Sequence, residues 1–561
     1  MKLSISSIVL ALSFATTGVF GSPVPTRSRQ MGSAARGKTV AGAAYLITNE
    51  PSGNQIIAAD INSDGTLTLR RAIDAGGIGA HGITDPNGPD PLFSQGAIKA
   101  SAAGNIVAAV NSGSNTLSVF NINPTDATNL QMIGQPVGSN GQFPMSLAIN
   151  KAGNMVCALN GGEINGVSCF KVDKTAGLVP IANTVRSLNL NQTTPATGPA
   201  GTASHVVFSE DNSQLIASVK GVPPTPGFLA VWDVAADGSL SQDFQSIAPA
   251  SGGLLPFSMT VIDGQNAILA TDAGLGFDIF DLAAASSDAS SSGDASVAAT
   301  AADDTAVASN VTSPATSDVA ATADNSTVSA SGSTDAADNS TAVAASNATI
   351  AARAAPGKTA VIVGVAPAAP NSPTAPVSNV TAVASATTAN ATVSATDATA
   401  DASNSTVSAA DATATSSNST VASDDSTSAS TGDRSSANAI SGQSATCWSS
   451  FSPKTGNFFL TDIGTATITE VNVDANLKGT IVKQYPQAAG SGTIDNDVAT
   501  VGKNDFLYVL AANASSIDVL ALPAPGKAKN IQKVDIAGPA KAAGIKVSAF
   551  NLQGMTTFIR K

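Results

Sequence analysis

The chain has 561 residues, of which 12% are charged and 4% aromatic, and its formal charge at pH 7 is −13. This acidic balance argues against nucleic acid and anionic membrane surfaces as partners. Three cysteines are too few for a disulfide scaffold, so a large apolar core must hold the fold together.

The first residues have the pattern of a secretory signal peptide. Lys2 precedes an apolar run from Ile8 to Phe20, and this run is too short to cross a bilayer. We therefore expect a signal peptide over residues 1–21 and a disordered N-terminal or pro segment over residues 22–38. The expected product is a secreted, extracellular protein without a membrane span, either free or associated with the cell wall.

From residue 39 onward one strand pattern recurs. Residues 203–234 show it in full, as an alternating HVVFS, a polar turn, QLIASVK, a Gly- and Pro-rich loop, and FLAVWDV. Related stretches begin at Gly96, Met145, Ser258, Cys447 and Asp497. Copies at a spacing of roughly fifty residues predict an all-β fold, a seven-bladed β-propeller, with a two-sheet sandwich as the alternative.

The two ends of the chain complete this ring. The first copy begins with AAYLITN and lacks an inner strand. In contrast, KVSAFNLQ, Lys546–Gln553, has the pattern of an inner strand that is not followed by the other strands of a copy. We predict that the C-terminal strand joins the first blade, which leaves only short, protected sheet edges. Blades one to five would then span residues 39–282, and blades six and seven with the closing strand residues 444–561.

Residues 283–443, between blades five and six, are rich in Ala, Ser, Thr and Asn and almost lack large apolar side chains. Such a segment buries too little surface to offset its ordering entropy, so we predict a disordered insert. Sequons there and in the repeats indicate N-glycosylation, although they also arise by chance in this composition. They lie at Asn191, Asn310, Asn325, Asn339, Asn347, Asn379, Asn390, Asn404, Asn418 and Asn513.

The cysteines leave two interpretations open. Cys157 and Cys169 fall on neighbouring predicted strands, MVCALN and VSCFKV, where they could form a disulfide in an oxidising compartment. Cys447 is then left over. In the alternative interpretation all three are small buried apolar residues.

Candidate site residues gather on one face of the predicted ring. Loops that join fourth to first strands, and second to third strands, surround one end of the channel, which we call the upper end. His205 lies there at the start of an inner strand, His81 in the loop Asp74–Gln95, and Lys220 and Glu163 in second-to-third loops. A histidine beside a carboxylate can act as acid or base, and a lysine can bind an anion. The alternative is that they are solvated rim residues.

Other sequence features suggest less chemistry. Asp272 and Asp462 each follow a threonine at the end of a second strand, where we expect them to form hydrogen-bonded turns. The sequence has no zinc-binding or nucleophile-elbow motif, so we predict neither a metal nor a cofactor.

Two stretches, YLITNEPSGNQIIAADINSDGTLTL and HVVFSEDNSQLIASVKG, resemble the seven-bladed lactonase family, which includes 6-phosphogluconolactonase-like proteins and fungal 3-carboxymuconate cyclases. More narrowly the chain resembles secreted, glycosylated fungal cyclase-like surface proteins, some of which act as antigens or adhesins. The resemblance implies a histidine, an acid and arginines that clamp a polycarboxylate. Only His205 carries over, because Arg70, Arg71 and Arg186 lie on predicted outer strands.

Two functional hypotheses follow. In the first, a secreted glycoprotein, predicted to be a monomer, uses its propeller to bind cell-wall or host-surface ligands. In the second, the protein is a lactonase or carboxymuconate cycloisomerase that acts on a small carboxylate or lactone, with His205 as acid or base and Lys220 and Glu163 as further catalytic candidates. The secretion signal, the glycosylated insert and the scarcity of catalytic groups favour the first.

Overall fold

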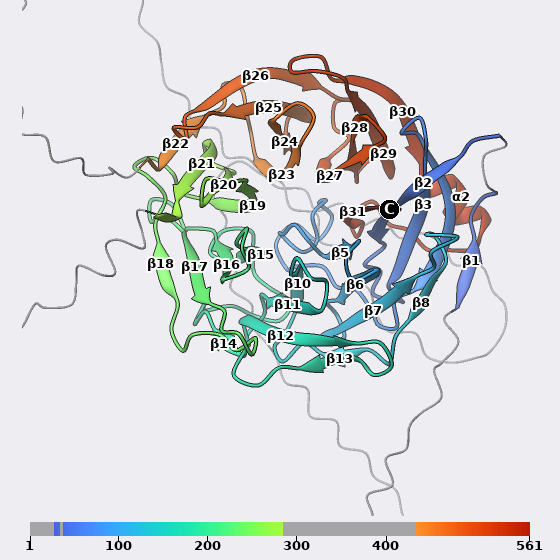
Figure 1. Cartoon of the computed structure of the whole chain (residues 1–561), viewed down its shortest axis with the longest axis horizontal. Coiled ribbons are helices and arrows are strands. Elements are labelled where there is room, and N and C mark those ends of the chain that lie inside the picture. Colours follow the sequence, from blue (N-terminus) through green and yellow to red (C-terminus); the bar gives the residue numbers. More distant parts are fainter. Residues whose placement is uncertain (1–26, 34–36, 284–433, 561) are drawn as a thin grey trace, which may run out of the picture. The chain divides into compact units, whose positions relative to one another are not determined.

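Seven antiparallel sheets form a closed ring in the computed structural model (Figure 1). The structure describes residues 27–33, 37–283 and 434–560, which belong to one compact unit. The innermost strand of every sheet contacts the innermost strands of both neighbouring sheets, so the ring has no open side. The predicted seven-bladed β-propeller is thereby confirmed.

In blades two to seven the strands run outward from the centre in chain order, whereas blade one starts at the centre with the C-terminal β31 and ends with β1. Blade one contains β31 (Gln553–Ile559), β2 (Val40–Ile47), β3 (Gln55–Asn62), β4 (Leu67–Asp74) and β1 (Ser28–Gln30). Blade two contains β5 (Ile98–Ser101), β6 (Ile106–Asn111), β7 (Thr116–Ile122), β8 (Leu130–Met132) and β9 (Val137–Gly138). Blade three contains β10 (Pro144–Ile149), β11 (Met155–Asn160), β12 (Gly166–Asp173), β13 (Gly177–Pro180) and β14 (Arg186–Ser187).

The other four blades have four strands each. Blade four contains β15 (Ala203–Phe208), β16 (Gln214–Val219), β17 (Phe228–Asp233) and β18 (Gln245–Ile247). Blade five contains β19 (Pro256–Ile262), β20 (Ala267–Asp272), β21 (Gly276–Asp281) and β22 (Ser436–Ala439). Blade six contains β23 (Thr446–Ser452), β24 (Asn457–Asp462), β25 (Thr467–Val473) and β26 (Gly479–Pro486). Blade seven contains β27 (Thr493–Val501), β28 (Asn504–Ala511), β29 (Ser516–Leu522) and β30 (Lys529–Asp535), and the helix α2 (Ala537–Ala542) follows it.

The C-terminal strand closes the ring, but it is not the strand that we predicted. The closing strand is β31, which pairs antiparallel with β2, rather than KVSAFNLQ. Residues 546–551 are instead held outside the sheet by Glu50, whose carboxylate accepts hydrogen bonds from the Ser548 amide at 2.7 Å and from Asn551 Nδ2 at 3.1 Å. Lys546 Nζ lies 3.1 Å from the same carboxylate.

Blade five takes its outer strand from the end of the predicted insert, residues 283–443. β22 pairs with β21, so this blade ends after residue 439 and not at residue 282 as we expected. The sequence of β22, SANA, contains no large apolar residue and therefore gave no strand signal. The predicted signal peptide and residues 284–433 of the predicted insert lie outside the described residues.

The N-terminal segment also differs from expectation. Residues 22–38 were expected to be disordered, yet β1 pairs with the outer strand β4 of blade one. Arg29 Nη1 donates to the carbonyl of Gly544 at 2.6 Å, which links this outer strand to the turn after α2.

Inner strands of six blades contain an irregularity close to their first residue. The register shifts between Pro144 and Ser146, Ala203 and His205, Pro256 and Met259, Thr446 and Trp448, Thr493 and Asn496, and Gln553 and Thr556. A bulge bends a strand and re-aims its side chains. Because the same place is affected in each blade, the upper ends of these strands present their side chains differently from a regular ladder.

The core lies between adjacent blades and within the sheets. Cys157 and Cys169 face each other on β11 and β12, are fully buried, and are joined by a disulfide, whereas Cys447 is buried with a free thiol.

None of the helices in the described residues combines the length and apolarity that crossing a membrane requires.

Candidate functional site

The upper end of the ring, where the inner strands begin, is filled by the chain itself. Residues 75–97 connect β4 to β5, and we call their last part, residues 91–96, the plug. Leu92, Phe93, Ser94 and Gln95 are all buried. Asp90 and Phe93 have φ values of 65° and 55°, which non-glycine residues rarely adopt, so their contacts must hold this conformation in place.

The plug is hydrogen-bonded to several inner strands. Ser94 Oγ donates to the carbonyl of Met145 on β10 at 2.8 Å, and the Gln95 amide donates to the carbonyl of Ser204 on β15 at 3.2 Å. The Gln95 side chain donates to the carbonyl of Ser449 on β23 at 3.0 Å and to that of Asn496 on β27 at 3.3 Å. These bonds span the ring from one side to the other.

Three side-chain donors converge on two consecutive carbonyl groups of the plug. Lys220 Nζ donates to Phe93 O at 2.8 Å. Trp448 Nε1 donates to Ser94 O at 3.1 Å, and Gln553 Nε2 donates to the same oxygen at 2.8 Å. Donors that could bind the oxygen atoms of a substrate are therefore occupied by the backbone of residues 93 and 94.

Lys220 is only 3% exposed, and its amine is fully engaged. Besides Phe93 O it donates to Ser204 Oγ at 2.6 Å and to Ala203 O at 3.1 Å, and it lies 4.5 Å from the centre of the Phe257 ring. Burial lowers the pKa of Lys220, and the nearby Asp90 carboxylate opposes this shift. In blade four Val219 takes the position that Asp272 has in blade five, since Ala203 pairs with Val219 as Pro256 pairs with Asp272, and Lys220 is the first residue of the loop that follows.

His205 lies beneath the plug on the bulge of β15 and is 1% exposed. Its Nδ1 accepts a hydrogen bond from the Met259 amide at 3.0 Å, so the proton of the neutral ring is on Nε2, which has no partner in the described part of the chain. Burial holds the pKa of His205 well below its usual value, and the charge of Lys99 adds to the effect. Within the described ranges, neither a carboxylate nor Lys220 is hydrogen-bonded to this ring.

Gly96, the last residue of the plug, packs against His205. Gly96 has a φ of +92°, and a Cβ placed there would lie 2.8 Å from Ser146 Oγ and 3.2 Å from the His205 ring. Glycine is needed at this position both for its backbone conformation and for the close approach. The plug therefore packs directly against the ring of His205, whose Nε2 has no hydrogen-bond partner in the described part of the chain.

Asp495 is a buried carboxyl group that the sequence analysis did not single out. Its Oδ2 accepts hydrogen bonds from Gln553 Nε2 at 2.7 Å and from the Gly554 amide at 2.8 Å, while its Oδ1 has no partner among the described residues. Burial raises the pKa of Asp495 to about 7. Burial and the charge of Asp495 also raise the pKa of Asp90. In the sequence, the sign of this buried carboxyl group is an acidic residue that follows the apolar Ile494 inside an inner strand.

The other predicted candidates lie apart from this cluster. His81 is half-buried, and its two ring nitrogens lie 2.8 Å from Gly82 O and 3.1 Å from Gly88 O in its own loop. Glu163 is exposed, and its amide donates to Thr194 Oγ1. The structure thus does not bring His81 or Glu163 to His205.

Asp272 and Asp462 act as turn residues, each accepting four backbone hydrogen bonds. Asp272 binds the amides of residues 254, 255, 274 and 275, and Asp462 binds those of residues 444, 445, 464 and 465. Their oxygens are saturated by the backbone, so neither is available as a general base in this conformation.

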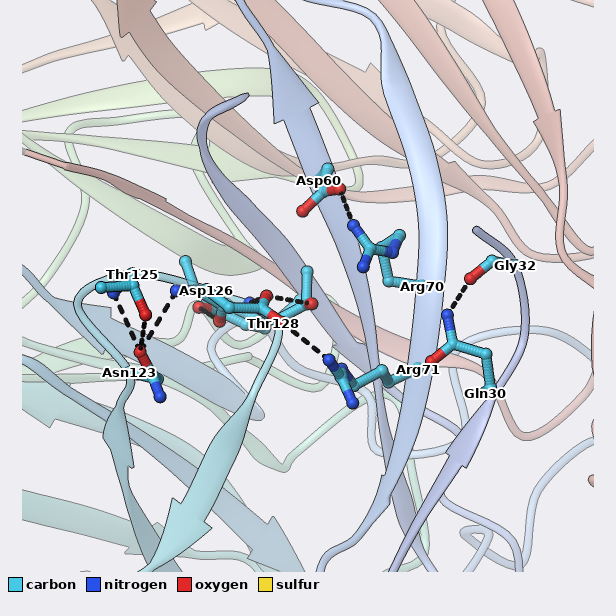
Figure 2. Close-up of polar contacts among 11 residues, drawn as sticks. Gln30, Gly32, Asp60, Arg70, Arg71, Asn123, Thr125, Asp126 and Thr128 are labelled. Atoms are coloured by element: carbon cyan, nitrogen blue, oxygen red, sulfur yellow. Dashed lines mark hydrogen bonds and ion pairs between the residues drawn. The ribbon is translucent and has the colours of Figure 1, made fainter. Parts of the chain in front are cut away.

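The arginines that the family resemblance would place around a polycarboxylate lie on outer strands of the ring, and Figure 2 shows two of them, Arg70 and Arg71, with their carboxylate partners. Arg70 and Arg71 are on the outer strand β4, where Arg70 pairs with Asp60 and Arg71 Nη2 lies 2.7 Å from Asp126 Oδ2. Arg186 donates from Nε to the carbonyl of Ser241 at 2.6 Å. The upper end of the channel therefore receives none of these three arginines.

Two of the predicted glycosylation sites lie in the described residues. Asn191 and Asn513 are both exposed, as attachment of a sugar requires. The sequons between residues 310 and 418 lie outside the described residues.

The fold and the filled channel define the chain first as a seven-bladed β-propeller whose upper opening is closed by its own loop. Residues 39–194 match the family described as "Lactonase, 7-bladed beta-propeller". This match covers blades one to three and agrees with the resemblance to the lactonase family that the sequence predicted.

Solved structures to which this chain is similar include the periplasmic gluconolactonase of Pseudomonas aeruginosa, at 12% identity and a TM-score of 0.47, covering 92% of this chain and 99% of that one. A proposed 6-phosphogluconolactonase of Bacteroides fragilis matches at 12% identity and a TM-score of 0.44, covering 94% and 99%. A search of curated proteins gave no significant match.

Proposed function

We propose that this protein is a secreted, glycosylated lactonase-family propeller that binds cell-wall or host-surface ligands and does not turn over lactones in its upper channel. The observation that carries the proposal is the plug, residues 91–96. A lactonase needs space for its substrate next to an acid or base and a group that stabilises negative charge. Here residues 93–96 occupy the place where His205, Lys220 and Gln553 meet.

The energetics of the plug support a closed channel. A substrate could reach His205 only after the hydrogen bonds of Ser94 and Gln95 had broken, at about 1 kcal/mol each. Removing Leu92 and Phe93 from the interior would add roughly 1.5–3 kcal/mol for each apolar side chain. These costs would be subtracted from the binding energy of any small carboxylate.

Secretion and glycosylation are the remaining parts of the proposal. They are supported by the signal-peptide pattern of residues 1–21 and by the exposure of Asn191 and Asn513. Sequencing the N-terminus of protein recovered from culture medium should give a start after residue 21. Deglycosylation should lower the mass, and Asn191→Gln should remove one sugar chain.

The enzymatic alternative has one observation in its favour. His205 Nε2 and Asp495 Oδ1 are buried without a partner in the described residues, and buried ionisable groups with shifted pKa values are frequent at active sites. If the plug opened, these two groups and the amine of Lys220 would become available for lactone hydrolysis or formation.

Turnover measurements separate the two candidates. Purified full-length protein is incubated with aldonolactones, 6-phosphogluconolactone and carboxymuconates, and we expect no turnover above background. Turnover that His205→Ala abolishes and His81→Ala retains would contradict the non-enzymatic proposal. His81→Ala is the matched control because His81 bonds only within its own loop.

Binding is measured separately. Full-length protein is titrated against isolated cell-wall fractions and immobilised host glycoproteins, with and without enzymatic deglycosylation. Saturable binding that survives deglycosylation is expected for a propeller-mediated interaction. Absence of saturable binding to either preparation would contradict the proposed role.

A further inference from the structure

The lower end of the channel, where the inner strands finish, contains an open cavity of about 370 Å³. It is lined by the ends of β5, β10, β15 and β19 and by the turn after β15. Its wall is apolar over much of its area, through Leu147, Ile149, Val206, Phe208 and Val261. Lys151, Glu210 and Asp263 supply the charged groups of its rim, and Lys99 lines it from β5.

Lys99 differs from Lys220, at the upper end of the channel, in the hydrogen bonding of its amine. Its side chain is half-buried, and within residues 27–33, 37–283 and 434–560 its ammonium makes no hydrogen bond and no ion pair. Lys220, by contrast, donates to three oxygen atoms. The Lys99 amine is therefore both free of protein acceptors and adjacent to a cavity.

The surroundings of Lys99 make protonation of its amine less favourable than in water. Burial lowers the pKa of Lys99, while the carboxylates of Asp497 and Asp495 act in the opposite direction. A lysine desolvated beside an apolar wall is more often unprotonated near pH 7 and then acts as a nucleophile. The charged and titratable groups that face it are Asp495 and Asp497 on β27, His205 on β15, and Lys151, Glu210 and Asp263 at the rim.

We propose that Lys99 is a carbonyl-reactive lysine that forms an imine with small apolar aldehydes entering the lower cavity. The amine nitrogen adds to the aldehyde carbon, and a proton moves to the carbonyl oxygen to give a carbinolamine. Loss of the hydroxyl group with a proton from nitrogen releases one water molecule and leaves the C=N bond. The reaction needs neither an oxidant nor a metal.

The apolar wall sets the class of ligand. Leu147, Phe208 and Val261 would contact a short aliphatic chain, whereas the aldehyde group would lie toward Lys99. Glu210 is less available to compete for the Lys99 amine because its Oε2 accepts a hydrogen bond from the Gly264 amide at 2.7 Å. An apolar aldehyde should therefore be preferred over a polyhydroxylated one of similar length.

Reductive trapping tests the proposal on the full-length protein. The chain is incubated at pH 7 with butanal and cyanoborohydride, and alkylated lysines are quantified by peptide mass spectrometry over time. We expect Lys99 to be labelled several-fold faster than the exposed Lys151 of the same cavity, since burial lowers the pKa of Lys99 and so increases the share of its free amine. Equal labelling of Lys99 and Lys151 would overturn the proposal.

Variants and a second aldehyde sharpen the result. Lys99→Arg keeps the positive charge but cannot form an imine, so the fast labelling phase should disappear, while Lys151→Arg should retain it. With glyceraldehyde in place of butanal, the ratio of the labelling rate of Lys99 to that of Lys151 should be lower. Equal preference for the two aldehydes would contradict a role for the apolar wall. Because the competition between Lys99 and Lys151 is measured in the unaltered protein, it does not depend on the folding of a variant.

Discussion

The two ends of the central channel differ in how their polar groups are used. At the upper end, the amine of Lys220, the indole of Trp448 and the amide of Gln553 donate to the backbone of the plug. At the lower end, the amine of Lys99 has no acceptor among the described residues and borders an open cavity. The comparison shows that one ring of inner strands can support a sealed structural core at one end and an open cavity at the other.

The largest expected effect is at the sealed end. Trp448 is fully buried, lies 5.2 Å from the Phe257 ring and holds Ser94 through its indole nitrogen. Trp448→Ala should lower the free energy of unfolding by about 3–5 kcal/mol, as truncation of a large buried aromatic does. Urea unfolding followed by circular dichroism measures the loss.

Trp232→Ala is the matched control, because Trp232 is equally buried in blade four but does not touch the plug through its indole nitrogen. Both variants should lose similar stability, yet only Trp448→Ala should make residues 75–97 sensitive to limited proteolysis. If the loop is cut equally in the two variants, Trp448 does not hold the plug.

The two lysines of the channel should respond differently to the same substitution. Lys220→Met leaves Phe93 O, Ala203 O and Ser204 Oγ without their donor and should cost about 1–3 kcal/mol. Lys99→Met removes no hydrogen bond and should change stability by less than about 0.5 kcal/mol. Thermal and urea unfolding of both variants give the comparison, and equal losses would show that the amines are used alike.

A smaller effect should appear as a pH dependence near the sealed end. Burial and the neighbouring Asp272 raise the pKa of Asp278 to about 9. The folded state therefore binds an extra proton between about pH 4 and pH 9, and its stability falls as the pH rises through this range. Asp278→Asn removes the penalty, so the variant should equal the native protein near pH 4 and exceed it by more than about 1 kcal/mol at pH 8.

Unfolding free energies at several pH values check this expectation. Asp263→Asn at the rim of the lower cavity is the control, because it removes the same carboxyl group from an exposed position. A flat difference between the native protein and Asp278→Asn would mean that Asp278 is ionised in the fold at neutral pH.

The ring could be predicted from the sequence because its signal is local and repeated. In each copy an alternating inner strand is followed by a Gly, Asn or Asp turn. This pattern can be recognised without knowing which residues are in contact. The exact closing strand could not be predicted, since KVSAFNLQ and QGMTTFI alternate equally well. Only the bonds from Glu50 to Ser548 and Asn551 decide between them.

The site was predicted only in part. The repeat placed His205 at the upper start of an inner strand, but not on a bulge. The plug could not be foreseen, because PDPLFSQG has no periodicity and its partners are distant. Trp448 is 354 positions away from Ser94 in the chain. Asp495 was missed because its role depends on Gln553 and Gly554, which arrive with the closing strand.

Hydrogen exchange of the plug tests the central claim most directly. The account predicts that the amides of residues 92–96 in the native full-length protein exchange as slowly as those of the inner strands, because they are buried and tied across the ring. The turn of residues 209–213 at the lower end should exchange much faster. Rapid exchange of residues 92–96, at the rate of that exposed turn, would contradict the account, since the upper channel would then be open.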